Sequence, residues 1–396
     1  MIIRNIMRWL HLPASRLYRL GICLAGFAGA WAGLGPQGVE AQQRADRIVI
    51  GLVSPLTGPL SGVGNEVALG TRAYFESLNR SGGVGGRLIE LVSMDDGNEP
   101  GRSTQAVDEI VAKHSPVAFA NCFGTVGCVA QATALRATRI PMIGPIAGAQ
   151  VLRTSEQRHV FAVRPNADSE VRALAEQMSE YGVQAAVVVY QDDGFGRAYL
   201  PTAQALLPTM NIRVAEVVQL NPASPDYDAA AKRIQRNKGH TVLLLANVTH
   251  SAGVLKAVSA IGVEPFVMNL AAQANAGFIK NMTGIWSYSV FATFTPSPWK
   301  RQLATVREYQ DAWMRVANNQ SFSYLGFEAY LNARVLGEAL QRADRRLTPE
   351  RVVAALEGMP ALNFDGLTVK FAADRRQGAD FVDIAVLSNG GRFVQQ

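Results

Sequence analysis

Continuous apolar runs of strand length constrain the fold of this chain more than any other feature of its sequence. Each run is followed by a segment long enough to form a helix, and their residues are 48–53, 88–92, 117–120, 185–190 and 241–246. Because the apolarity is continuous rather than alternating, we expect helices to cover both faces of these strands. Strands that alternate with helices predict parallel-rich α/β sheets.

The alternation of strands and helices occurs twice, which predicts two lobes. About 355 residues follow position 41, more than a single hydrophobic core normally serves. The chain is expected to pass between the lobes near 164, at 293–298 and at 358–364. We therefore predict an α/β fold with two Rossmann-like lobes joined by a three-crossing hinge. The predicted lobe boundaries are 42–163 plus 296–358 for one lobe and 164–295 plus 359–396 for the other.

The first 41 residues have the pattern of a secretory signal peptide. Four arginines precede the apolar run 20–34, and Val39-Glu40-Ala41 offers small residues for cleavage before Gln42. The apolar run is shorter than the roughly 20 residues that a membrane-spanning helix needs, so a retained anchor is the less favoured alternative. A lipid anchor on Cys23 is disfavoured because bulky Ile22 precedes it. We expect a periplasmic protein exported by a cleavable signal peptide.

The composition and the motifs argue against nucleic-acid binding and against catalysis. Loss of residues 1–41 removes four Arg and one Glu, which lowers the formal net charge from +6 to +3, and the rest has no Lys/Arg blocks that would bind nucleic acid. No phosphate-binding loop, GxSxG, HExxH or CxxC motif occurs. The paired carboxylates Asp95-Asp96 and Asp192-Asp193 follow strands, where such residues more often cap helices than catalyse. We expect no enzyme, cofactor or metal.

A series of short motifs follows the chain in order from residue 50 to residue 330. They are IGLVSPLTGP at 50–59, NRSGGVGGR at 79–87, DD at 95–96, GT at 124–125, IPMIGP at 140–145, YQDDGFG at 190–196 and GFEAY at 326–330. Together they resemble leucine/isoleucine/valine-type periplasmic binding proteins, the type I substrate-binding proteins of ABC transporters. The resemblance implies two lobes that close on a small molecule, with an ABC permease and its ATPase subunits as partners. We expect a monomer.

The loops that follow the strands are expected to line the ligand cleft, because ligands bind beyond the carboxyl ends of strands in open α/β sheets. Residues 124–127 and 146–149 combine small side chains with the unpaired N–H groups of helix starts. The resemblance implies that these loops hold a carboxylate, with Thr125 as hydroxyl donor. The alternative is that the glycines only permit tight turns. The candidate ligand-binding residues are Val63, Thr125, Val126, Gly127, Ile146, Ala147, Gly148, Phe195, Val248 and Ala271.

The chain departs from amino-acid-binding relatives where they carry an acidic residue for the ligand ammonium. Residues 269–273, which follow the strand at 266–268, contain no acid. Burial of an ammonium without a charged partner is costly. Val63 and Ile146 also make the pocket more apolar. We therefore expect an aromatic or apolar carboxylate ahead of a branched-chain amino acid. A periplasmic sensing module for a membrane receptor is the alternative function.

Two cysteines remain after the signal peptide, Cys122 and Cys128, and both lie within the segment NCFGTVGC. An oxidising compartment favours a disulfide between them. The alternative is a pair of buried free thiols.

Overall fold

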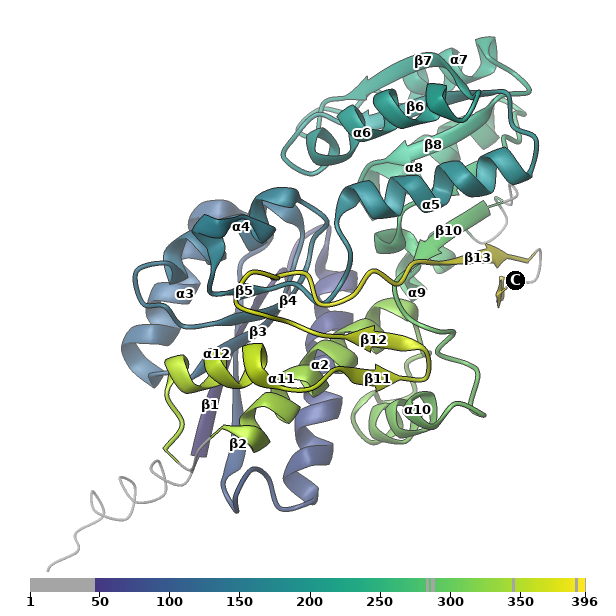
Figure 1. Cartoon of the computed structure of the whole chain (residues 1–396). Helices are drawn as coiled ribbons and strands as arrows, with labels where there is room; N and C mark the ends of the chain where they lie inside the picture. Colours follow the sequence, from purple (N-terminus) through teal and green to yellow (C-terminus); the bar gives the residue numbers. More distant parts are fainter. Residues whose placement is uncertain (1–46, 283–284, 286–288, 344–345, 389–390, 396) are drawn as a thin grey trace, which may run out of the picture. The chain divides into compact units, whose positions relative to one another are not determined.

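The structure is a computed structural model that describes residues 47–282, 285, 289–343, 346–388 and 391–395 (Figure 1). The predicted signal peptide and its cleavage site therefore lie outside the described residues. Within the segment Ile48–Gln396, which forms one compact unit, the strands assemble into two large sheets and one short hairpin.

The first sheet has five strands in the order β2-β1-β3-β4-β5. The strands are β1 (Arg47–Ser54), β2 (Leu88–Asp95), β3 (Ala118–Phe123), β4 (Met142–Ile146) and β5 (Val160–Phe161). Pairing is parallel from β1 through β3 and β4 to β5. Every residue of β3 and β4 is buried. The prediction that helices cover both faces is thus confirmed for this sheet.

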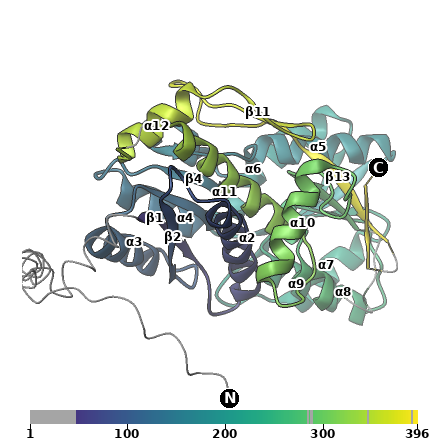
Figure 2. The ribbon, with the colours of Figure 1, turned by 90° about the horizontal axis from the view of Figure 1, so that it is seen from below.

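Separate cores lie on the two faces of the first sheet. One core contains residues of α3 (Pro100–His114) and α4 (Thr125–Leu135). The larger core contains residues of α2 (Ser61–Arg80), α10 (Ala304–Val316), α11 (Tyr324–Arg342) and α12 (Pro349–Gly358). Figure 2 shows α2 and α11 side by side, with α10 next to them. The helices that complete the larger core thus come from the far end of the chain.

The α2–α11 contact depends on a glycine pair. A Cβ atom at Gly70 would overlap the carbonyl oxygen of Gly326, so the two helix backbones touch at this point. Any larger residue at position 70 would push the helices apart and open the core between them.

The second sheet has seven strands in the order β14-β13-β10-β9-β8-β6-β7. They are β6 (Ala185–Gln191), β7 (Arg213–Leu220), β8 (Thr241–Leu245), β9 (Val267–Asn269), β10 (Ser289–Thr293), β13 (Asp383–Leu387) and β14 (Phe393–Gln395). β6 to β10 pair in parallel, whereas β13 and β14 are antiparallel. One face packs on α5 (Ala167–Glu180) and α6 (Gly196–Thr209), the other on α7 (Tyr227–Arg236), α8 (Val248–Ala260) and α9 (Ala276–Asn281).

The predicted third crossing at 358–364 is wrong, and so is the assignment of residues 359–379 to the second lobe. The hairpin of β11 (Leu362–Phe364) and β12 (Leu367–Val369) buries Phe364 and Leu367 in the larger core of the first lobe, together with Phe371 and Ala379. The chain reaches the second sheet only at β13 (Figure 1). The side chains of the hairpin therefore complete the cover of α11.

Candidate functional site

The two lobes contact each other at the carboxyl ends of their strands. Thr249 Oγ1, in the first turn of α8, donates a hydrogen bond to the carbonyl oxygen of Pro59, at 3.3 Å. A Cβ atom at Gly194 would lie 3.3 Å from the Val126 side chain. A buried apolar cluster also joins the lobes, here called the cleft cluster. Its members are Leu60, Val63, Val67, Phe123, Ile146, Ala272, Leu325 and Ala329, with half-buried Val248 packed against them.

A buried hydroxyl without a partner lies at the start of α4, beside this cluster. Gly124 precedes the helix with φ of 85°, and no side chain caps the helix start. Thr125 is 5% exposed, and its Oγ1 has no hydrogen-bond partner among the described residues. The first N–H groups of any helix also lack an intrahelical acceptor. The first turn of α4 can therefore bind an anion through one hydroxyl and several amides.

The two glycines of this turn have packing roles of their own. A Cβ atom at Gly124 would lie 2.5 Å from Asn98 Oδ1, and one at Gly127 would lie 3.1 Å from Asp96 Oδ2. Gly127 thus faces the loop before α3, so any contact of this residue with a ligand would be made by its backbone N–H. The close packing that these glycines permit agrees with the tight-turn interpretation, and contact of the loop with a ligand stays a prediction.

Cys122 and Cys128 form a disulfide across the same turn. Their Cα atoms are 5.5 Å apart, and both side chains are fully buried. The bond links the end of β3 to the first turn of α4, so the intervening loop with Gly124 and Thr125 is closed into a small ring.

Reduction of this disulfide is expected to lower the free energy of unfolding by about 2 kcal/mol, because a short closed loop loses its constraint on the unfolded chain. Urea unfolding with and without reductant measures the difference. The variant Cys122→Ala/Cys128→Ala is the control, since its unfolding should not respond to reductant. Equal curves for the oxidised and reduced wild-type protein would contradict the expectation.

The candidate residues at the end of β4 and in the loop after it lie in different surroundings. Ile146 belongs to the cleft cluster, whereas Ala147 packs in the core with α3 and α4. A Cβ atom at Gly148 would overlap the hydroxyl of Tyr199. Arg153 donates hydrogen bonds to the carbonyl oxygens of Ala147 and Ala149, at 3.3 and 3.0 Å. The backbone of this loop is therefore firmly held.

The candidate residues of the second lobe begin helices or turns. Phe195 directly precedes α6, and its ring centroid is 5.2 Å from that of Tyr199. Val248 begins α8 behind the capping residue Asn247. Ala271 begins the 3-10 turn η3 (Ala271–Gln273) and is 5% exposed. Val248 and the neighbour of Ala271, Ala272, join the cleft cluster, whereas Phe195 packs in the core of α5 and α6.

A buried carboxylate reaches the turn at which the sequence carries no acid. Glu170 Oε1 accepts a hydrogen bond from the N–H of Ala271 at 2.6 Å, and Oε2 accepts one from the hydroxyl of Tyr199 at 2.9 Å. Burial raises the pKa of Glu170, while the nearby Arg164 counteracts this rise. Sequence reasoning missed this residue because it lies on α5, about 100 residues before the turn that it contacts.

The first crossing of the chain carries a buried ion pair. Arg164 Nε and Nη2 donate to the two carboxylate oxygens of Glu328, each at 2.7 Å. Burial would lower the pKa of Arg164, but the facing Glu328 carboxylate raises it above its ordinary value. The guanidinium also lies over the ring of Phe294, 4.3 Å from its centroid, at the second crossing. This pair thus connects two of the chain crossings to α11.

The carboxylates that follow the strands stabilise nearby turns by accepting hydrogen bonds from backbone N–H groups. Asp95 Oδ1 accepts hydrogen bonds from the N–H groups of Leu56 and Thr57. Asp193 Oδ1 accepts them from Phe195 and Gly196. Across the described residues, no group of three or more His, Cys, Asp or Glu side chains is arranged to hold a metal ion. None of the helices in the described part of the chain is long and apolar enough to cross a membrane.

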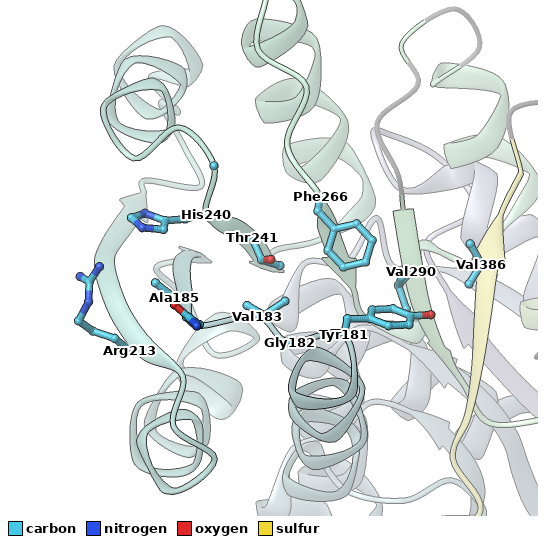
Figure 3. Close-up of a pocket in the computed structure, with 12 residues that line it drawn as sticks. Tyr181, Gly182, Val183, Ala185, Arg213, His240, Thr241, Phe266, Val290 and Val386 are labelled. Carbon is cyan, nitrogen blue, oxygen red and sulfur yellow. The ribbon is translucent and has the colours of Figure 1, made fainter.

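A cavity of about 880 Å³ lies away from all of these residues, at the amino ends of strands in the second sheet. Figure 3 shows the rings of Tyr181 and Phe266 at one side of it and the side chains of Arg213 and His240 at the other. None of the candidate ligand-binding residues lines it. The site predicted from the sequence is therefore distinct from this cavity.

Comparisons with known proteins agree with this architecture. The family model for periplasmic binding proteins matches residues 47–392. Leu/Ile/Val-binding protein homolog 3 of Brucella melitensis is 24% identical over 218 residues, which cover 52% of this chain and 59% of that protein. The leucine-, isoleucine-, valine-, threonine- and alanine-binding protein of Pseudomonas aeruginosa is 23% identical, with 86% of this chain and 87% of that protein aligned.

A solved structure shares the fold. The structure of a branched chain amino acid ABC transporter protein from Thermus thermophilus with bound valine superposes with a TM-score of 0.78 and 18% identity, covering 88% of this chain and 94% of that chain. The family match spans nearly all of the described residues, and the two sheets are parallel-rich, as the alternation of strands and helices predicted. The chain therefore belongs to the periplasmic binding protein family and has the two-lobed type I fold of the solved structures that it matches.

Proposed function

We propose that this protein is the exported substrate-binding protein of an ABC importer and that it captures a small carboxylate-bearing ligand between its lobes. The observation that carries this proposal is the buried, unpartnered hydroxyl of Thr125 at the uncapped start of α4. A carboxylate there would accept hydrogen bonds from this hydroxyl and from the first amides of the helix. The signal-peptide pattern and the names of the relatives support export and delivery to a permease and its ATPases.

The cleft cluster supports an apolar or aromatic body for the ligand. It consists entirely of apolar side chains from both lobes, which include Val63 and Ile146 of the first lobe and Ala272 of the second. Apolar area removed from water contributes roughly 25 cal/mol per Å², so this surface favours a hydrocarbon group over a polar one.

The carboxylates near the site already accept hydrogen bonds from the protein, which argues against a ligand that carries an ammonium group. Both oxygens of Glu170 already accept hydrogen bonds, and Arg164 lies close enough to influence its charge. Asp193 holds the start of α6. An aromatic or aliphatic monocarboxylate therefore fits the site better than an amino acid. A branched-chain amino acid is the second candidate ligand, favoured by the names of the Brucella and Pseudomonas relatives.

A thermal-shift screen of residues 42–396 tests this proposal. Benzoate, phenylacetate and short aliphatic acids form one arm, and L-leucine, L-valine and other amino acids form the second. A ligand at 100 times its dissociation constant stabilises the folded protein by about 2.7 kcal/mol, which raises the Tm measurably. Stabilisation by monocarboxylates supports the proposal. Stabilisation by amino acids alone would overturn the preferred ligand class, and the lack of any shift would count against carboxylate capture.

The variant Thr125→Val is expected to weaken binding of the compound found in this screen by about 10- to 100-fold. It removes one hydrogen bond to a charged group, which contributes about 1.5–3 kcal/mol. Isothermal titration calorimetry measures the dissociation constant. Thr133→Val is the matched control, because Thr133 is exposed on the same helix and bonds only to the carbonyl oxygen of Val129. Equal losses in both variants would show that Thr125 does not contact the ligand.

A further inference from the structure

The strongest unexplained feature of the cleft is a polar bridge made of two side chains that are each 1% exposed. Tyr199 of α6 and Glu170 of α5 lie within the core of the second lobe, where burial of polar groups is costly unless they are paired. Neither residue belongs to the candidate set that the sequence predicted. The bridge reaches the backbones of two residues in that set, Ala271 through a hydrogen bond and Gly148 through close packing.

One end of the bridge lies against the first lobe. A Cβ atom at Gly148 would overlap the Tyr199 hydroxyl and would lie 2.9 Å from the ring carbon that carries it. The phenol end of Tyr199 therefore packs directly on the backbone of residues 146–149. Only glycine at position 148 leaves room for this contact.

The other end of the bridge lies at the turn η3. The Tyr199 hydroxyl donates to Glu170 Oε2, and Glu170 Oε1 accepts the N–H of Ala271 at 2.6 Å. The bridge thus runs from Gly148 through Tyr199 and Glu170 to Ala271. Its hydrogen bonds fix the distance between α6 and η3, which both face the cleft.

The loop on which Tyr199 packs is itself rigidly held. Arg153 donates to the carbonyl oxygens of Ala147 and Ala149 and also to that of Pro165, at 2.9 Å, in the first crossing. The N–H of Ala167 donates to the carbonyl oxygen of Gly148 at 2.8 Å. A side chain that packs against a fixed backbone defines how closely the second lobe can approach.

We propose that Tyr199 and Glu170 are positioning residues that set the closed position of the lobes, with Gly148 as the surface on which Tyr199 docks. The effect on ligand affinity rests on the function proposed above, whereas the effect on lobe position does not. Tyr199 contacts Gly148 and so limits how closely the second lobe can approach the first. Glu170 holds Ala271, and with it the neighbouring cleft cluster, at a fixed distance from that contact. Neither side chain contacts the ligand.

Three variants test this proposal: Tyr199→Phe, which removes only the hydroxyl, Glu170→Gln, which keeps the shape but removes the charge, and Gly148→Ala. Tyr181→Phe is the control, because Tyr181 is exposed and packs against Phe266, away from the cleft. Spin labels on Asp108→Cys in α3 and Lys232→Cys in α7 report the distance between the lobes. Amide hydrogen exchange reports the protection of residues 146–149 and 271 in the free protein.

Tyr199→Phe and Glu170→Gln are expected to speed exchange of the Ala271 amide several-fold in the free protein, with no change in Tyr181→Phe. With benzoate or L-leucine at saturation, whichever binds, both variants should broaden the distribution of interlobe distances in the closed state. They should also raise the dissociation constant of that compound about tenfold. Gly148→Ala should shift that distance outward, and less so in the Tyr199→Phe background, where the overlapping oxygen is absent. If neither compound binds, amide hydrogen exchange and the interlobe distances in the free protein still test the proposal.

A lower Tm in these variants with unchanged exchange at Ala271 and unchanged interlobe distances would overturn the proposal, because the bridge would then only stabilise the core. Equal effects of Gly148→Ala in both backgrounds would overturn the docking contact. If Thr125→Val lost binding while the Tyr199 and Glu170 variants closed normally, the proposed ligand site would be supported. Only the positioning role of Tyr199 and Glu170 would then be refuted.

Discussion

The variant Glu66→Gln is expected to remove about 3 kcal/mol of pH dependence from the stability of this protein between pH 4.5 and pH 8. Glu66 lies on α2 and is buried, and burial raises its pKa from 4.5 to about 7. The Ser323 side chain and the Ala276 backbone, from α9 of the second lobe, bond to its carboxyl group. One pKa unit corresponds to 1.36 kcal/mol, so the shift of this group is among the largest single contributions to pH dependence.

The direction of this effect follows from proton binding. The folded protein holds the Glu66 proton more tightly than the unfolded chain, so the associated stability is fully present below pH 4.5. It is lost as the pH rises through about 7. Glutamine cannot ionise, and it retains an acceptor for the amide of Ala276. The variant should therefore be more stable than the wild type at pH 8.

Urea unfolding of both proteins across this pH range measures the effect. Glu76→Gln is the matched control on the same helix, because the Glu76 side chain is 44% exposed and pairs with Arg80 at 3.7 Å. Parallel stability curves for the wild type and Glu66→Gln would show that Glu66 is charged in the folded protein.

The variant Glu328→Ala is expected to lower the free energy of unfolding by about 3–5 kcal/mol. It leaves Arg164, which is 4% exposed, without its carboxylate partner, and a lone buried charge is strongly destabilising. Glu308→Ala, which breaks the more exposed pair with Arg334, should cost less than about 1 kcal/mol. Chemical unfolding at neutral pH compares the two variants.

A double variant shows whether the lost stability comes from the unpaired charge of Arg164 or from the lost packing of Glu328. Arg164→Met/Glu328→Leu replaces the ion pair by apolar side chains of similar size, and such replacements are often neutral or stabilising. We expect it to recover most of the stability lost in Glu328→Ala. If the double variant were as unstable as the single one, the loss would come from packing of Glu328 and not from the unpaired Arg164.

Most of the fold could be predicted because buried parallel strands leave a strong local signal. The runs at 48–53, 185–190 and 241–246 became β1, β6 and β8. β7 lacked this signal, since it lies at the edge of the second sheet and only two of its eight residues are buried. The third crossing was misplaced because the apolar residues of 362–371 can cover either lobe, and their sequence does not say which.

The candidate site residues that could be predicted are those that directly follow a strand. Thr125 was expected at the cleft because it follows β3, and the structure places its hydroxyl unpaired beside the cleft cluster. Leu325 and Ala329 of the same cluster were missed, since on α11 they read as ordinary helix core. Tyr199 and Glu170 were missed because only the tertiary structure brings them to Gly148 and Ala271.

The larger core of the first lobe is discontinuous in sequence, and this has a consequence for the nascent chain. All strands of the first sheet are complete once residue 161 has been made, but α11, which covers one face, ends at Arg342. At roughly 5–20 residues per second, synthesis of the intervening segment takes about 10 to 40 seconds. During that time α2, α3 and α4 are present, but the face that carries the larger core lacks the cover of α10, α11 and α12. The first lobe can therefore complete its core only after most of the chain has been made.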